Sequence, residues 1–339
     1  MTKSMLCAAL VLALAACAEG CAHERARVDP LAEVHATNLA ELERWAWPDP
    51  DDAWRPLAEH QLIALEQLVG LLIAEAERAQ LSRAQRRQAA SLAALIGMEL
   101  RHATLAIDGR SVRVWVVSEP ADDRRGRGTY VIRLGPLAPA HAELLLQAPH
   151  DRFDKRTGAL ALRLLVEGDV SSVRAVFINS AHRYRQLDGS KEPRKPADAN
   201  PADAAHNPEH PLARTTARAL EQRELVLVQL HGFARSAEAG DPDLIVSSGV
   251  VQPSRISAAM VERLRTVLPE HPCGHHGIDT ERLGGHHNVQ GHAARAALRC
   301  FVHLELSEEL REQLIEDREL RRRFASALPS AAEDSRDCP

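Results

Sequence analysis

Three short apolar runs in this chain each end on, or contain near their end, a side chain that can bind a metal ion or a proton. Residues 143–150 close on His150, residues 225–231 close on His231, and residues 301–306 contain Glu305. Runs of this length and composition predict buried strands of an α/β sheet, and ligands gather beyond the carboxyl ends of such strands. The pattern therefore predicts an α/β fold that brings these three side chains to one edge of its sheet.

Asp154 follows His150 by four residues, so one short turn can carry both side chains. Two histidines and a carboxylate form the ligand set of an open catalytic zinc (Zn²⁺) site, in which the fourth position holds a water whose pKa falls to about 7. We therefore predict His150, Asp154 and His231 as zinc ligands. Glu305 shares a strand face with His303, and a carboxylate within an apolar strand needs a partner or a task. Its predicted task is that of the general base.

Each of these residues also has a plainer interpretation. A histidine that ends a buried strand can simply bind backbone carbonyls, and the chain contains 17 histidines. Asp154 can cap the turn ahead of a helix that Thr157 opens. Glu305 can be an edge-strand charge, which would require solvent on its face of the sheet.

The motifs that carry these residues resemble a known family. They are Gln147-Ala-Pro-His150, Asp154-Lys-Arg-Thr-Gly158, Gln229-Leu-His231-Gly-Phe233 and His303-Leu-Glu305-Leu-Ser307. Together they resemble the zinc amidohydrolases that include N-formylglutamate amidohydrolases and poly-γ-glutamate hydrolases, which are cousins of zinc carboxypeptidases. The resemblance covers residues 140–328. It implies a three-layer α/β/α fold with a mixed sheet, one zinc ion on His150, Asp154 and His231, and activation of the bound water by Glu305. The first motif departs from the carboxypeptidase pattern, since it reads His-x-x-x-Asp in place of His-x-x-Glu.

The amino terminus has the pattern of an export signal. Lys3 precedes an apolar stretch at 5–16, and Leu14-Ala-Ala-Cys17 resembles a bacterial lipobox, with a plain signal peptide as the alternative. We predict a leader at 1–16, lipidation of Cys17 and a tether at 17–55. The lipid would make the membrane a partner and place the protein in the cell envelope, at the outer membrane or the periplasmic face, because Ala18 rather than Asp follows Cys17. No later apolar run reaches the ~20 residues of a spanning helix.

An oxidising compartment permits disulfides among the four remaining cysteines, in three connectivities. These cysteines are Cys21, Cys273, Cys300 and Cys338. Cys273 with Cys300 is the preferred pair, because both flank a loop rich in glycine and histidine at 271–292.

The rest of the chain divides into a helical segment at 56–101, an α/β catalytic domain at 102–328 and a tail at 329–339. Apolar residues at helical spacing and a capping box at Ser82 predict two helices in the first part, the second ending near Arg101. Residues 111–117 and 129–134 predict antiparallel strands at the sheet edge. One helix is predicted from Ser307 to about Leu328.

Candidate substrate contacts follow the predicted strand at 172–178. Arg183 can bind a substrate carboxylate through two hydrogen bonds, with support from Asn179. An ion pair between Arg183 and a loop acid is the alternative. Residues 186–210 form a long, proline-rich segment, which predicts either a lid or a disordered insert, and Asp203-Ala-Ala-His206 within it can reach the site, where His206 is a candidate substrate contact.

The loop at 271–292 is predicted to form one wall of the substrate cleft through Asn288 and its neighbours. A separate metal site on Cys273, His275 and His276 is the alternative, although no spaced Cys-x-x-Cys pattern supports it.

Composition excludes some classes of function. A net charge of −5 and an aromatic content of 3% argue against nucleic acid as a partner. The working hypothesis is an envelope-anchored, zinc-dependent hydrolase that cleaves an amide or peptide bond. Its small-molecule or peptide substrate would be an N-acyl amino acid, a γ-glutamyl compound or a cell-wall peptide. The alternatives are a non-catalytic envelope lipoprotein that keeps the fold as a binding or structural module, and a metal-storage lipoprotein that holds more than one metal per chain.

Overall fold

The computed structural model describes residues 33–34, 38–46, 54–78, 80–107, 110–137, 142–166, 172–236 and 240–329. The leader at 1–16, the lipidation site Cys17 and most of the tail at 329–339 lie outside the described residues, so these remain predictions. None of the described helices combines the length and the apolar character needed to cross a membrane.

The described strands form one ten-stranded sheet in the order β1-β2-β3-β4-β6-β5-β7-β10-β8-β9. Their bounds are β1 (Glu33–Val34), β2 (Glu99–Ile107), β3 (Arg110–Ser118), β4 (Thr129–Arg133), β5 (Glu143–Ala148), β6 (Val173–Ile178), β7 (Leu225–Phe233), β8 (Leu244–Ser247), β9 (Cys273–His275) and β10 (Phe301–Ser307). The neighbours β6, β5, β7 and β10 are parallel, and β4 and β8 flank them antiparallel. The sheet is therefore mixed, as predicted.

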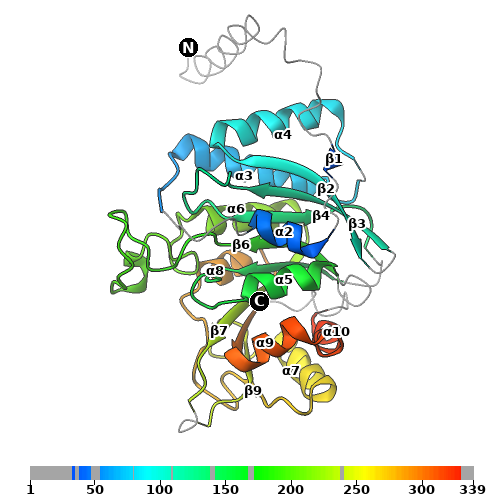
Figure 1. The fold of residues 1–339 in the computed structure, drawn as a ribbon. Coiled ribbons are helices and arrows are strands. Elements are labelled where there is room, and N and C mark those ends of the chain that lie inside the picture. Colours follow the sequence, from blue (N-terminus) through cyan, green and yellow to red (C-terminus); the bar gives the residue numbers. More distant parts are fainter. Residues whose placement is uncertain are drawn as a thin grey trace, which may run out of the picture.

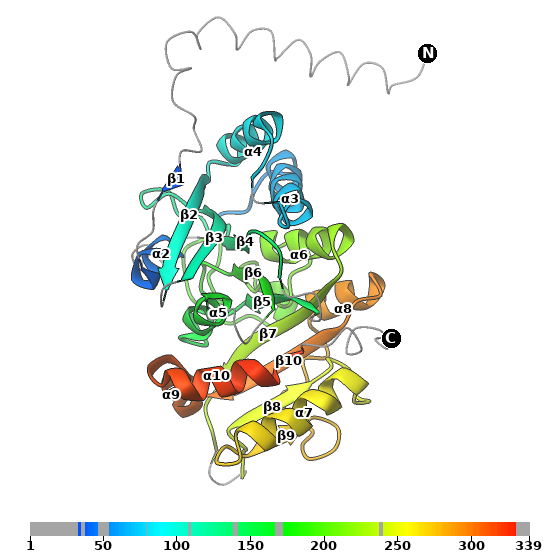
Figure 2. The same cartoon turned by 90° about the vertical axis from the view of Figure 1, so that its right-hand side faces the viewer.

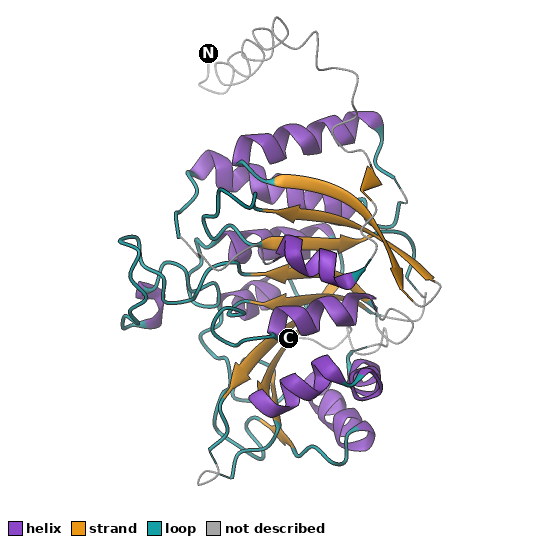
Figure 3. Ribbon diagram, viewed as in Figure 1, coloured by secondary structure: helices purple, strands orange, loops and turns teal. Residues whose placement is uncertain are grey.

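Helices cover both faces of this sheet (Figures 1 and 3). They are α2 (Leu39–Ala46), α3 (Glu59–Ala74), α4 (Arg83–Ile96), α5 (Thr157–Val166), α6 (Pro211–Gln222), α7 (Arg255–Val267), α8 (Val289–Ala296), α9 (Glu308–Glu316) and α10 (Arg318–Ala327). One core cluster joins α2, α5, α7, α9 and α10 to one face, and a second joins α3, α4, α6 and α8 to the other. Figure 2 shows α3, α6 and α8 on one side of the strands and α2, α5 and α9 on the other. The predicted α/β fold with helical layers on both faces is confirmed.

The two helical layers explain why the central strands are mostly apolar. In β7, Val226 and Val228 pack into the first cluster, while Leu225 and Leu227 pack into the second. A strand that is covered on both faces gains from apolar residues at every position, at about 25 cal/mol per Å² of apolar surface that folding removes from water. The polar residues at the carboxyl ends of these strands are therefore exceptions that need partners.

The amino-terminal segment differs from the prediction in two places. Helix α2 lies inside the expected tether at 17–55, and Leu42 is fully buried in the core. Its eight residues are too few to give a clear periodic pattern. Helix α4 ends at Ile96, because Gly97 takes a left-handed conformation with φ of +64° and caps it. The chain then enters β2, a strand that the sequence analysis did not foresee, and β3 and β4 pair antiparallel beside it as predicted.

The single helix predicted from Ser307 to about Leu328 is in fact two helices. Asp317 separates α9 from α10, and its side chain accepts hydrogen bonds from the backbone N–H groups of Glu319 and Leu320. An aspartate that caps a new helix competes with continuation of the old one, which accounts for the break.

The preferred disulfide between Cys273 and Cys300 is wrong. Cys273 is a free, buried cysteine, whereas Cys300 is disulfide-bonded, so the two are not paired with each other. Cys273 begins β9 and Cys300 directly precedes β10, and β8 lies between these two strands. Neighbouring strands are about 4.8 Å apart, so the two cysteines are at least about 10 Å apart, which exceeds the reach of a disulfide. The register separates them further, because Cys273 is paired with Leu244, and Leu244 with Leu306 at the opposite end of β10 from Cys300.

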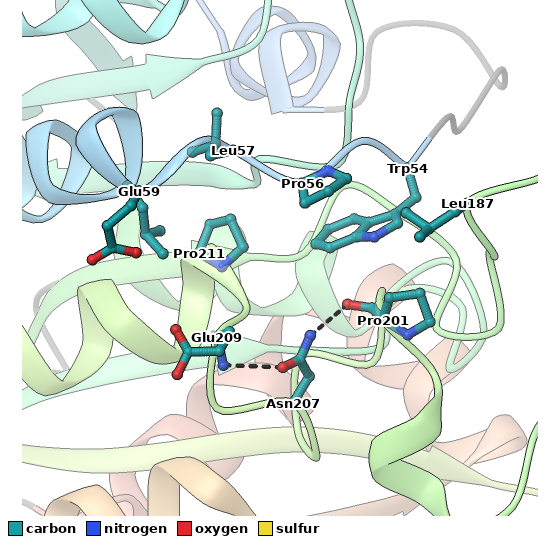
Figure 4. Close-up of a pocket in the computed structure, with 10 residues that line it drawn as sticks. Trp54, Pro56, Leu57, Glu59, Leu187, Pro201, Asn207, Glu209 and Pro211 are labelled. Carbon is teal, nitrogen blue, oxygen red and sulfur yellow. Dashed lines mark hydrogen bonds between the residues drawn. The ribbon is translucent and has the colours of Figure 1, made fainter.

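The segment at 186–210, predicted to be a lid or a disordered insert, is a folded loop. Asn200 is buried, and its side chain accepts a hydrogen bond from Arg194 N at 2.8 Å and donates one to Arg194 O at 2.9 Å. Trp54 stacks on His210 with ring centroids 4.8 Å apart. Figure 4 shows the hollow of about 290 Å³ that Trp54, Leu187 and other residues of the two segments line. The loop is thereby fixed against the chain ahead of α3.

Candidate metal centre

The three predicted ligands lie together at the carboxyl ends of β5 and β7. Backbone N–H groups of Phe153 and Asp154 both donate to His150 O, at 2.7 and 2.6 Å, and close the turn after β5. Asp154 Oδ2 lies 3.2 Å from His231 Nδ1 and 3.6 Å from His150 Nδ1. One ligand atom from each of the three residues falls within 4.8 Å of the others. The structure therefore assembles the predicted two-histidine, one-carboxylate set.

The second ring nitrogen of each histidine is held by a hydrogen-bond acceptor. His150 Nε2 lies 2.7 Å from Asp203 Oδ1, and His231 Nε2 lies 3.2 Å from Gln229 Oε1. Carboxylate and amide oxygens only accept, so Asp203 and Gln229 favour a proton on each Nε2, which leaves each Nδ1 as the atom that can bind a metal ion. Arg183 Nη1 lies 3.2 Å from His150 Nδ1 and can donate to it. Both Nδ1 atoms face the Asp154 carboxylate, so all three groups could bind one cation.

The orientation of Gln229 is itself fixed by a chain of buried amides. Its Nε2 donates to Gln147 Oε1 at 2.8 Å and to Gln290 Oε1 at 3.2 Å. Its Oε1 accepts from Asn288 Nδ2 at 2.5 Å in addition to the contact with His231. All four amides are buried, and each satisfied amide constrains the next. This network leaves Gln229 one way to face His231.

Asp203 anchors the other histidine and lies in the folded loop at 186–210. Arg183 donates two hydrogen bonds to its Oδ2, at 3.1 and 2.7 Å, and His206 Nδ1 lies 3.1 Å from its Oδ1. Burial raises the pKa of Asp203, but the charges of His150 and Arg183 outweigh burial and hold it well below its ordinary value. Asp203 is therefore an anion beside His150, in the position of an outer carboxylate that orients a metal-binding imidazole.

A second group, His150 with Asp203 and His206, also has ligand spacing. The guanidinium of Arg183 bonds Asp203 there, and a cation so close repels a metal ion. Arg183 also lies 3.2 Å from His150 Nδ1, which belongs to the group with Asp154 and His231. Among the described residues no arginine or lysine forms an ion pair with Asp154, however, so this group is the better metal centre.

The two histidines differ in protonation. Burial lowers the pKa of His231 to about 4, with a further contribution from His303, so the ring is neutral at pH 7. Burial also lowers the pKa of His150, but the charge of Asp203 and the hydrogen bonds with Asp154 and Asp203 outweigh burial and raise it, so a metal ion there must displace a proton. Burial raises the pKa of Asp154, but hydrogen bonds from His150 and His231 outweigh burial and hold it well below its ordinary value. A neutral imidazole and an ionised carboxylate are the forms that bind metal.

Glu305 lies beside this centre on the neighbouring strand. It is in register with His231 across the parallel pair β7 and β10, and its Oε1 lies 3.1 Å from His303 Nε2. Glu305, Asp154, His231 and Arg183 all line one pocket of about 450 Å³. Because Glu305 opens into this pocket, it can accept a proton from a water molecule there.

The other predicted substrate residues fall into two groups. Arg183 lines the pocket and stacks on the rings of Phe153 and Tyr184 at 5.6 and 5.1 Å, and His206 joins it on Asp203. Asn179, by contrast, is fully buried, and its amide donates to the carbonyls of Pro149 and Ala202. Asn288 caps α8 through the N–H groups of Gln290 and Gly291. The side chains of these two asparagines form hydrogen bonds with the surrounding backbone, so no substrate contact is proposed for either.

The alternative metal site on Cys273, His275 and His276 is not formed. Neither ligand group found among the described residues includes a residue of the loop at 271–292. His275 Nε2 pairs with Ser257 Oγ at 3.0 Å, and His276 Nε2 faces His286 Nε2 at 2.8 Å. Burial raises the pKa of Cys273 to about 12, which keeps the thiol protonated and a poor ligand.

Sequence reasoning placed Asp203 and Gln229 near the site but gave neither of them its role, which is to orient the two histidines. Gln229 had a visible signal, because it and Gln147 interrupt apolar strands at matching places two and three residues before the histidines. Asp203 had none beyond the Asp-Ala-Ala-His spacing, since its contact with His150 joins positions 53 residues apart.

Comparison with known proteins gives weak structural similarities only. No protein-family model and no curated protein sequence matches this chain. Solved structures similar to it include N-formylglutamate amidohydrolase from Ralstonia eutropha JMP134, at 14% identity and a TM-score of 0.35, covering 56% of this chain and 93% of that one. A metallo-carboxypeptidase from Burkholderia cenocepacia matches at 13% identity and a TM-score of 0.37, covering 61% and 60%. An aspartoacylase family protein from Mesorhizobium loti matches at 14% and 0.35, covering 65% and 62%. Scores of this size carry no functional argument, so the function proposed below rests on the geometry of the site itself.

Proposed function

We propose that this chain is a zinc-dependent hydrolase that cleaves an amide or peptide bond. One observation carries the proposal: both imidazole Nδ1 atoms face the Asp154 carboxylate, because Asp203 and Gln229 hold the opposite ring nitrogens. A donor set of this kind fits zinc and leaves a coordination position open.

His150, Asp154 and His231 would hold the ion, which when bound supplies a Lewis acid that polarises a carbonyl oxygen and acidifies water. Glu305 would accept a proton from water in the pocket and deliver it to the leaving amine nitrogen, which balances the hydrolysis. Arg183 would bind an acidic group of the substrate only in part, because Asp203 already takes two of its hydrogen bonds. The side chains of Phe153 and Phe233 line the same pocket and would shield the reacting bond from bulk water.

The substrate class and the cellular location are further, more specific proposals. N-acyl amino acids, γ-glutamyl compounds and cell-wall peptides are the substrate classes consistent with an envelope enzyme. The leader and the Leu14-Ala-Ala-Cys17 motif support anchoring in the envelope through a lipid on Cys17.

A hydrolysis screen tests the proposal. The full chain would be stripped of metal, reloaded with zinc, and assayed on one amide from each substrate class. Hydrolysis that disappears on stripping, returns with zinc and is absent from Glu305→Gln would support the enzyme. A zinc-loaded chain that hydrolyses none of the classes, yet binds their members, would instead be a binding module.

A further inference from the structure

One buried arginine contacts the three segments that carry the site. Arg311, on α9, donates from Nε to Lys155 O at 3.0 Å and from Nη1 to Leu306 O. Its guanidinium also lies directly against Gly232, where an added Cβ would collide with it. Arg311 is 5% exposed, and it borders the pocket that Asp154, His231 and Glu305 line.

The three contacts share one sequence relation to the site. Lys155 follows the predicted ligand Asp154, Gly232 follows the ligand His231, and Leu306 follows the predicted base Glu305. A shift in any of these backbones moves the functional side chain one residue before it. The guanidinium is planar and carries five N–H donors in fixed directions, so it can hold several backbone groups in one arrangement.

We propose that Arg311 is a positioning residue that sets the spacing of Asp154, His231 and Glu305. The roles of the three positioned side chains rest on the proposed function, but the contacts of Arg311 with the three segments do not. Two of its donors are used by backbone carbonyls, which distinguishes it from an arginine that waits for a substrate carboxylate. Gly232 is part of the same arrangement, because any side chain at this position would displace the guanidinium of Arg311.

Arg321 provides a matched control. It is equally buried, at 5% exposure, and its Nη1 donates to the backbone carbonyls of Leu314 and Ile315 at 2.7 and 3.1 Å. These carbonyls lie at the end of α9 and carry no site residue, and Arg321 does not line the pocket. Replacing it removes the same kind of buried guanidinium from the same pair of helices. An effect that Arg311→Met and Arg321→Met share therefore reflects the general loss of a buried arginine and not the positioning of the site.

The experiment measures hydrogen exchange and zinc affinity in the full chain. Exchange would be followed in peptides covering 150–157, 231–236 and 305–311, without metal, for Arg311→Met, Arg311→Lys, Gly232→Ala and Arg321→Met. We expect Arg311→Met and Gly232→Ala to speed exchange in all three segments by about tenfold and to weaken zinc binding by about tenfold. Arg311→Lys should lie between wild type and Arg311→Met, and Arg321→Met should leave the three segments and the affinity within about twofold.

A double mutant adds an internal check. If Gly232→Ala acts by displacing Arg311, then the two changes combined should weaken zinc binding by about tenfold and not by about a hundredfold. Additive losses would overturn the proposal, as would unchanged exchange in Arg311→Met or equal effects of Arg311→Met and Arg321→Met. If Arg311→Met does not fold, Gly232→Ala and Arg311→Lys decide by the same criteria. A wild-type chain that binds no zinc would refute the proposed function, whereas the metal-free exchange would still decide the role of Arg311.

Discussion

Replacing Asp203 with asparagine should weaken zinc binding, although Asp203 is not itself a ligand of the preferred centre. Its Oδ1 lies 2.7 Å from His150 Nε2 and fixes the ring so that Nδ1 faces Asp154. An asparagine can present its nitrogen there, and that nitrogen cannot accept the imidazole proton. Outer partners of metal-binding histidines typically change affinity 10–100-fold, which corresponds to about 1.4–2.7 kcal/mol.

The same substitution should also cost stability. It leaves the guanidinium of Arg183 without its buried anion, and removal of one partner from a buried ion pair costs about 3–5 kcal/mol. The Arg183 side chain keeps 17% exposure, so water compensates in part, and we expect a loss of about 2–3 kcal/mol in the free energy of unfolding. Chelator competition would measure the affinity and urea denaturation the stability.

Asp243→Asn is the control for this prediction. Asp243 also joins a histidine to an arginine, with His271 Nδ1 at 2.8 Å and Arg235 Nη1 at 2.6 Å, but it lies outside the ligand set. The Asp243→Asn variant should be less stable than wild type and should bind zinc with wild-type affinity. The reasoning fails if Asp203→Asn binds zinc within about twofold of wild type, or if Asp243→Asn weakens binding equally.

Three further outcomes are expected. Glu305→Gln should retain one zinc per chain and lose about 10²–10⁴-fold in hydrolysis rate, and a loss of metal would show that Glu305 is a ligand instead. Burial lowers the pKa of His210 to about 3, below an unfolded value of about 6.5, so stability is complete above pH 6.5 and falls as the pH drops towards 3. His210 should therefore contribute a fall of about 2 kcal/mol in the free energy of unfolding from pH 7.5 to pH 5, and His210→Asn, which keeps an acceptor for Leu212 N, should lose this contribution; equal slopes in the two proteins would refute it. Because burial raises the pKa of the Cys273 thiol to about 12, the native protein should resist alkylation of Cys273 by iodoacetamide at pH 8, and prompt modification seen by mass spectrometry would contradict this.

Local pattern was enough to predict the elements that carry the site. Strands buried on both faces are mostly apolar, so their carboxyl ends at His150 and His231 were visible in the sequence, as was Glu305 within the last strand. The fold class followed from the same runs. These features depend on neighbours along the chain, which the sequence shows directly.

Features that depend on strand order or on distant segments could not be predicted. The predicted disulfide between Cys273 and Cys300 was wrong because β8 lies between β9 and β10, and no local sequence pattern indicates this strand order. Asp203 reaches His150 from an irregular loop, where hydrophobic periodicity gives no guide. The contacts of Arg311 with Lys155 and Leu306 likewise follow from tertiary packing alone.

The most direct test of the central claim is the zinc content of the purified full chain and its variants, measured by elemental analysis after zinc exposure and desalting. We expect about one zinc per chain in wild type, and almost none in His150→Ala or His231→Ala. His271→Ala, which removes a buried histidine outside the ligand set, should keep the metal. No bound zinc in wild type, or zinc that persists in both ligand variants, would contradict the metal centre described here.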